Sequence, residues 1–198
     1  MRKFAPLAYV LVAALLPAVP ALAADTVPVR IEAARLAYGK GDLAHAAAEL
    51  EAAVVEMHGR LGRALGEVMP PPLNGWRGEA VEAQGLTSTG GGLAVSLAYG
   101  RDDSSLNASL ILDSPAVFAA AGQFAATALD QPNIRRVKIG AEDALLRWDA
   151  DNHAGEITMV LGNRVLLQIE GDNLGSSDLL VESARGWNVA GIRKILGM

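Results

Sequence analysis

The sequence predicts an α+β fold: an N-terminal helical hairpin, then an antiparallel sheet of about six strands packed with two or three helices. Three observations predict it. Apolar residues recur every three or four positions in the first third of the chain, three consecutive prolines end that pattern, and beyond Gly92 apolar and polar residues alternate. Because the first period is typical of helices and the second of strands, the helices precede the sheet.

Residues 1–23 have the pattern of a secretory signal peptide. Arg2 and Lys3 supply a positive start, residues 4–19 are almost wholly apolar, and residues 21–23 place small side chains where a signal peptidase reads them. Pro17 and Pro20 interrupt the segment, which is shorter than the roughly 20 apolar residues of a spanning helix. We therefore expect export, cleavage, and a soluble periplasmic protein without a membrane anchor.

Composition excludes several chemistries. The chain has 22 acidic against 17 basic side chains, a net charge of −5, which argues against nucleic acid as a partner. It contains no cysteine, so disulfides, a lipid-anchored cysteine, zinc–thiolate sites and cysteine nucleophiles are all excluded. We expect no cofactor.

Residues 28–68 predict the helical hairpin. Pro28 suits a first helical turn, and residues 39–42 (Gly-Lys-Gly-Asp) combine a glycine stop with Asp42 as the N-cap of the second helix. That helix carries one apolar stripe, which we expect to be buried against the first helix or the following domain. The stripe consists of Leu43, Ala47, Leu50, Val54, Met57, Leu61, Leu65 and Val68.

Residues 41–53 resemble the second-helix half of a single tetratricopeptide-type repeat, on Gly41-Asp42-Leu43, Ala46, Leu50 and Ala53. The resemblance implies a peptide-binding repeat array. Such arrays need stacked copies, and no second copy is visible at that period. A hairpin that packs on itself or on the next domain is the favoured alternative.

Residues 69–75 contain three prolines and predict a stiff linker. The α+β sandwich domain then spans 76–198, with Trp76 as a buried anchor. Alternation predicts strands at 93–99 and 106–112, with Tyr99 opposite Leu106. Ser114 and Pro115 open a helix that we expect to reach about Leu129.

Four shorter strands are expected near 134–139, 144–149, 156–161 and 165–170. In the last hairpin, Leu161 opposite Val165 keeps both apolar rows on one face, whereas a two-residue turn would mix the faces. We therefore expect an odd-numbered loop or a bulge. Ser176 or Ser177 is expected to cap a closing helix that runs to about Ala184, and residues 187–196 supply a last apolar cover.

The segment 76–198 resembles the PsbP-like domains of small exported bacterial proteins. The resemblance rests on Val137-Lys138-Ile139-Gly140-Ala141, on Gly162-Asn163-Arg164-Val165-Leu166, and on a strand that ends Glu170-Gly171 before a C-terminal helix. It implies a fold and no activity, and no functional residue follows from it.

Two polar clusters are candidate sites. Asp149, Asp151, His153 and Glu156 could ligate a divalent cation at a hairpin tip, but Ala154 and Val160 stand where a calcium loop needs glycine and a bidentate glutamate. Asp and Asn also form ordinary turns, which is the favoured interpretation.

Arg136 and Lys138 form the second cluster, on one strand face beside Arg135. The favoured interpretation is a solvated sheet face or a charged edge. The alternative is a site for an anion or an acidic partner.

No motif indicates catalysis: H-E-x-x-H and G-x-S-x-G are both absent from the sequence. The leading hypothesis is an exported non-enzymatic protein that binds or supports another cell-envelope protein. The alternative is a periplasmic carrier of a small molecule or metal ion, and a hydrolase is third.

Overall fold

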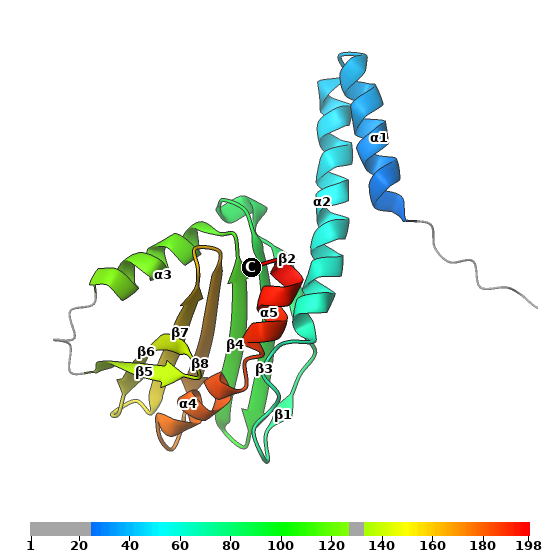
Figure 1. Ribbon diagram of the computed structural model, residues 1–198. Coiled ribbons are helices and arrows are strands. Elements are labelled where there is room, and N and C mark those ends of the chain that lie inside the picture. The colour runs from blue at the N-terminus through cyan, green and yellow to red at the C-terminus, as the bar shows by residue number, and fades with distance from the viewer. Residues whose placement is uncertain (1–24, 127–132) are drawn as a thin grey trace, which may run out of the picture.

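The computed structural model describes residues 25–126 and 133–198, so the predicted signal peptide and the predicted helix end near Leu129 lie outside the described residues. A helical hairpin projects from an antiparallel sheet that carries further helices (Figure 1). The α+β prediction is confirmed. The helices are α1 (Thr26–Gly39), α2 (Leu43–Gly66), α3 (Pro115–Ala126), α4 (Asp178–Arg185) and α5 (Val189–Leu196).

The sheet has eight strands in the order β1-β3-β4-β8-β7-β6-β5, and β2 pairs beside β1 on β3. The strands are β1 (Arg77–Gly78), β2 (Glu82–Gly85), β3 (Leu93–Arg101), β4 (Ser104–Leu112), β5 (Ile134–Ile139), β6 (Glu142–Asp149), β7 (Ala154–Leu161) and β8 (Val165–Asp172). Six were predicted. β1 and β2 were not predicted because their residues are exposed and neither strand shows apolar alternation.

Both predicted registers are confirmed. Tyr99 lies opposite Leu106, and Leu161 lies opposite Val165 across a three-residue loop. At the start of β3, Gly92 has φ 102°, and a Cβ there would lie 2.3 Å from the carbonyl oxygen of Leu112. Glycine is required at this position because any side chain would collide with the neighbouring strand.

The main core lies on the sheet face that α4 and α5 cover. Leu180, Trp187 and Ile192 pack there on the apolar rows of β3, β4, β7 and β8. Val117 of α3 is fully buried outside that core, and α3 contacts β4, β7 and β8. The sheet is therefore covered on one face and only in part on the other.

The two helices of the hairpin meet through small side chains. Val27, Ala34 and Ala37 of α1 are buried against Ala46 and Ala53 of α2. Small residues let helix axes approach closely, so this interface forms without large apolar side chains. The Asp42 cap is confirmed, since its side chain accepts a hydrogen bond from the backbone N–H of His45 at 3.1 Å.

The prediction that the large apolar stripe of α2 is buried is wrong for its first half. Leu43, Leu50 and Met57 are 63%, 50% and 43% exposed, whereas Leu65 is fully buried. The alanines of α2 lie on a neighbouring face of the helix and take the contact with α1. Only the last turns of the stripe reach the body.

Those last turns belong to the main core. Leu65, Val68 and Met69 pack with the buried residues of the sheet. Gly62 lies against β2, where an added Cβ would be 2.5 Å from the Cβ of Ala83. The predicted anchor Trp76 is buried, with the Arg101 guanidinium 4.9 Å from its ring centroid. α2 thus runs without a break from the hairpin into the core.

Two glycines of α2 provide a matched test of this contact. We expect Gly62→Ala to lower the free energy of unfolding by about 1–3 kcal/mol, because the methyl group forces α2 away from β2. Gly59→Ala should instead raise it by up to about 1 kcal/mol, since only the Arg63 side chain is nearby and alanine favours helix. Urea denaturation measures both, and equal effects would contradict the close contact.

A buried hydrogen bond ties the predicted linker to the sheet. The Tyr99 hydroxyl donates to the carbonyl oxygen of Pro70 at 2.5 Å, and burial raises the pKa of Tyr99 to about 12. We expect Tyr99→Phe to cost about 1 kcal/mol at pH 7. Because the folded state holds this proton more tightly, the stabilisation is complete below pH 10 and is lost as the pH rises toward 12. Denaturation curves across this range should show a steeper loss for the native chain than for the variant.

Candidate functional site: the surface of the helical hairpin

The predicted cation ligands do not converge. Asp149 is occupied by its own turn: its carboxylate accepts hydrogen bonds from the backbone N–H groups of Asp151 and Asn152, each at 3.1 Å, and from the Asn152 side chain at 2.7 Å. These bonds lower the pKa of Asp149. His153 has φ 52° in the same turn. In the part of the chain that the structure describes, no three His, Asp or Glu side chains are placed to hold a metal ion.

Glu156 lies further along β7, on the sheet face opposite the main core. It forms an ion pair with Arg147 of β6 at 2.8 Å and accepts a hydrogen bond from Gln168 at 3.0 Å. Gln168 also donates to Glu170 at 2.7 Å, so one amide bridges two facing carboxylates. This row of polar side chains crosses three strands, and its members pair with one another through an ion pair and hydrogen bonds.

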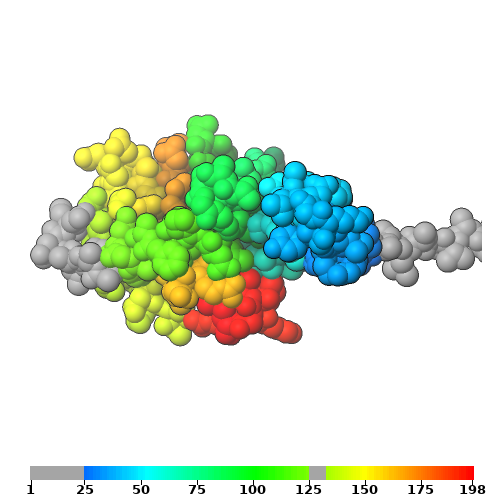
Figure 2. Space-filling view, turned by 90° about the horizontal axis from the view of Figure 1, so that it is seen from above, coloured from blue at the N-terminus to red at the C-terminus, as the bar shows by residue number. Residues whose placement is uncertain are grey.

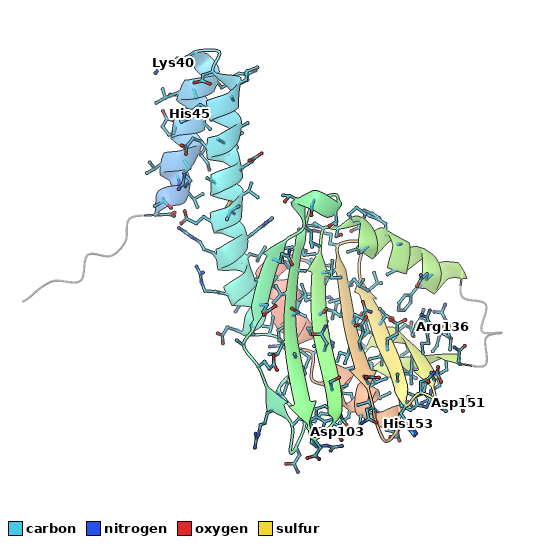
Figure 3. All side chains as sticks on the ribbon, turned by 180° about the vertical axis from the view of Figure 1, so that it is seen from behind. Lys40, His45, Asp103, Arg136, Asp151 and His153 are labelled. Atoms are coloured by element: carbon cyan, nitrogen blue, oxygen red, sulfur yellow. The ribbon has the colours of Figure 1, made fainter. Side chains whose placement is uncertain are left out.

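The two basic candidates are also engaged. Lys138 forms an ion pair with Asp143, its neighbour on β6, at 2.9 Å. Arg136 donates to the carbonyl oxygen of Phe124 in α3, and Figure 3 shows it at the far side of the sheet from the hairpin. Arg135 points elsewhere and donates to the Ser177 hydroxyl at 3.2 Å. The pair therefore serves mainly to hold β5, β6 and α3 together.

The most unusual surface is on the hairpin. Of the eleven large apolar side chains exposed among the described residues, eight lie on α1 and α2. Exposed large apolar side chains are therefore concentrated on the hairpin. The hairpin forms a separate lobe at one side of the body (Figure 2). The eight side chains are Val29, Ile31, Leu36, Tyr38, Leu43, Leu50, Val55 and Met57.

Five of these side chains form what we call the hairpin strip: Ile31 and Tyr38 on α1, and Leu43, Leu50 and Met57 on α2. Successive members on each helix are seven residues apart, which puts them on one face of that helix.

The two helices contribute to the same side of the hairpin. On α1, Thr26 and Ile31 lie on opposite sides of the face that contacts α2. On α2, Glu56 and Leu50 lie on opposite sides of the face that contacts α1. The Thr26 hydroxyl donates to the Glu56 carboxylate, so those flanks adjoin. The strip residues of both helices therefore lie together on the other side, while Val29, Leu36 and Val55 lie away from it.

The strip leads into a groove at the base of the hairpin. The groove has a volume of about 390 Å³ and lies between α2, the ends of β3 and β4, and α5. Leu61, which follows Met57 by one turn of α2, lines it together with His58 and Leu196. The strip and groove form one continuous surface on the side of the molecule that carries α5.

One ion pair fixes the floor of this groove. Arg164 donates from Nε and Nη2 to both carboxylate oxygens of Asp113, at 2.8 and 2.7 Å, and from Nη1 to the carbonyl oxygen of Leu196 at 3.4 Å. The bidentate contact lowers the pKa of Asp113. Arg164 thereby joins the β7–β8 turn, the end of β4 and α5.

A second groove, of about 680 Å³, opens at the opposite end of the sheet. Five carboxylates line it, from Glu79, Asp102, Asp103, Glu170 and Asp172. Figure 3 places Asp103 and His153 at this end, far from Lys40 and His45 at the hairpin tip. The groove is open and acidic, which suits neither an apolar ligand nor an anion.

No protein-family model, curated protein or solved structure matches the chain. The PsbP-like and tetratricopeptide resemblances therefore stay predictions. Among residues 25–126 and 133–198, no helix is both long and apolar enough to cross a membrane.

Sequence reasoning found the residues of the strip on α2 but assigned them to the interior. The signal that separates the two outcomes is the spacing of alanine. Ala46 and Ala53 lie seven apart on α2, and Ala34 and Ala37 share one face of α1, so the small residues define the contact between the helices. Large apolar residues then fall on the flanks.

The turn interpretation of Asp149 is directly testable. We expect Asp149→Ala to lower the melting temperature by a few degrees, because three hydrogen bonds within the turn are lost. The loss should be the same in EDTA and in millimolar Ca²⁺ or Zn²⁺. A rise in melting temperature on adding either cation to the native chain, absent in the variant, would support the cation site instead.

Proposed function

We propose that this chain is an exported, non-enzymatic periplasmic protein that binds or supports another cell-envelope protein, and that the hairpin is its recognition element. One observation carries the proposal: large apolar side chains are exposed on both sides of an arm that projects from the folded body. Contiguous apolar surface of this kind marks interaction sites in soluble proteins.

The anchoring of the arm supports a binding role. The last turn of α2 is held in the main core through Leu65, together with Val68 just beyond the helix end. The base of α1 is tied to α2 by the ion pair of Asp25 and Arg60 at 2.7 Å. A rigid arm loses little conformational entropy on binding, which favours affinity. The arm therefore presents a preformed surface.

The alternatives lack comparable support. A carrier needs an enclosed pocket, whereas the space between the sheet and helices α4 and α5 is filled by core side chains. A hydrolase needs an activated nucleophile, and the polar clusters described above pair with each other in structural roles. Both remain predictions without an observation that favours them.

Affinity capture from a periplasmic extract tests the proposal. The side of the hairpin away from the strip is changed with Val29→Glu and Leu36→Glu, and the strip itself with Leu50→Glu. We expect the native chain to enrich the same envelope protein reproducibly, and at least one of these variants to lower the enrichment about tenfold, since buried apolar anchors dominate such interfaces.

The control is Asp103→Ala, in the turn between β3 and β4 at the opposite end of the sheet. It should leave the enrichment unchanged. If the variants of both sides capture the partner as well as the native chain, the hairpin is not the recognition element.

A further inference from the structure

We propose that the hairpin strip is the interface of a homodimer: a second copy of this chain lays its own strip against the first, and the two hairpins form a four-helix bundle. This goes beyond the proposed function, because the Val29, Leu36 and Val55 side of each arm remains free for another protein.

The spacing of the strip suits this packing. Ile31 and Tyr38, and likewise Leu43, Leu50 and Met57, recur every seven residues, which is the repeat of left-handed helical bundles. Helices in such bundles interlock large side chains along one seam. The seam inside the hairpin is made of alanines, so the strip is a second, unused seam of larger residues.

The area available matches what a dimer needs. The hairpin face is about 21 Å long where both helices run side by side, because α1 has 14 residues, and two adjacent helices are about 20 Å wide. Two such faces have a flat area of roughly 840 Å² in total. The accessible surface of their side chains exceeds this flat area, so the buried area approaches the roughly 1,000–1,200 Å² of the smallest stable specific interfaces. A single helix of another protein would cover about half of it.

The proposed arrangement has a two-fold axis parallel to the helices. This axis places α1 of each copy on α2 of the other.

This arrangement also aligns the apolar residues. Ile31 is eight residues before the end of α1 and Leu50 is seven residues after the start of α2, so both lie about 11–12 Å from the hairpin tip. Tyr38 and Leu43 both lie near the tip. Each residue of α1 in the strip therefore meets a residue of α2 at the same level in the other copy.

Light scattering coupled to size-exclusion chromatography of the mature chain tests the proposal. The native protein should have the mass of a dimer at tens of micromolar, and Leu50→Glu should weaken dimerisation at least a hundredfold. Val55→Glu is the matched control: Val55 is 71% exposed on the same helix, away from the strip, and its replacement should leave the dimer intact. Circular dichroism confirms that both variants fold.

Disulfide trapping tests the arrangement, since the natural chain has no cysteine and every cross-link comes from the introduced ones. Mixing Ile31→Cys with Leu50→Cys under mild oxidation should give the mixed dimer several-fold faster than either variant gives its own dimer. If each variant forms its own disulfide dimer faster than the mixed dimer forms, α1 does not lie on α2 of the other copy, and the proposed arrangement is overturned.

A native chain that is monomeric at about 100 µM, or a Val55→Glu variant that dissociates as readily as Leu50→Glu, overturns the dimer. Either result leaves the proposed recognition of an envelope protein intact, because capture depends on the hairpin and not on its dimerisation. A native chain that is dimeric but enriches no envelope protein would overturn the proposed recognition and leave the dimer intact.

Discussion

The arrangement of this protein depends on a single helix that takes part in two packings. The first turns of α2 contact α1 through Ala46 and Ala53. Its last turn enters the sheet core through Leu65, and Val68 joins that core just beyond the end of the helix. The close contact at Gly62 and β2 joins the two regions. Because the helix is continuous, the core fixes the direction of the hairpin, and the alanine interface decides which side chains the hairpin exposes.

The polar residues of the sheet serve this architecture. Arg164 joins the end of β4 to α5, Tyr99 holds the proline segment, and Glu156 pairs across β6, β7 and β8. Asp149, Lys138 and Arg136 are likewise used to stabilise a turn, a strand pairing and the contact with α3. The apolar surface of the hairpin has no such use within the fold, and this is why we propose a binding role rather than catalysis.

Most of the fold was predictable and most of the candidate site was not. Alternation fixes a strand register wherever one face is buried, so the pairing of Leu161 with Val165 followed from the residues alone. β2 pairs through its backbone while its side chains stay exposed, so no apolar pattern in the sequence predicts this strand. The hairpin strip was misassigned because a helical stripe of large residues does not say whether its partner lies in the same chain. An ordinary turn was the favoured interpretation of the cluster around Asp149. The cation site stayed an alternative because spacing along the chain does not show that Glu156 lies away from the turn.

Hydrogen exchange of the full chain tests most directly whether α2 is shared between the hairpin and the core. Amides of the last two turns of α2, residues 59–66, should exchange as slowly as those of β4 and β8, because they open only on global unfolding. Amides of α1 should exchange faster. If residues 59–66 exchange as fast as α1, the hairpin is a loosely attached appendage, and its exposed surface is not held in a fixed direction by the core.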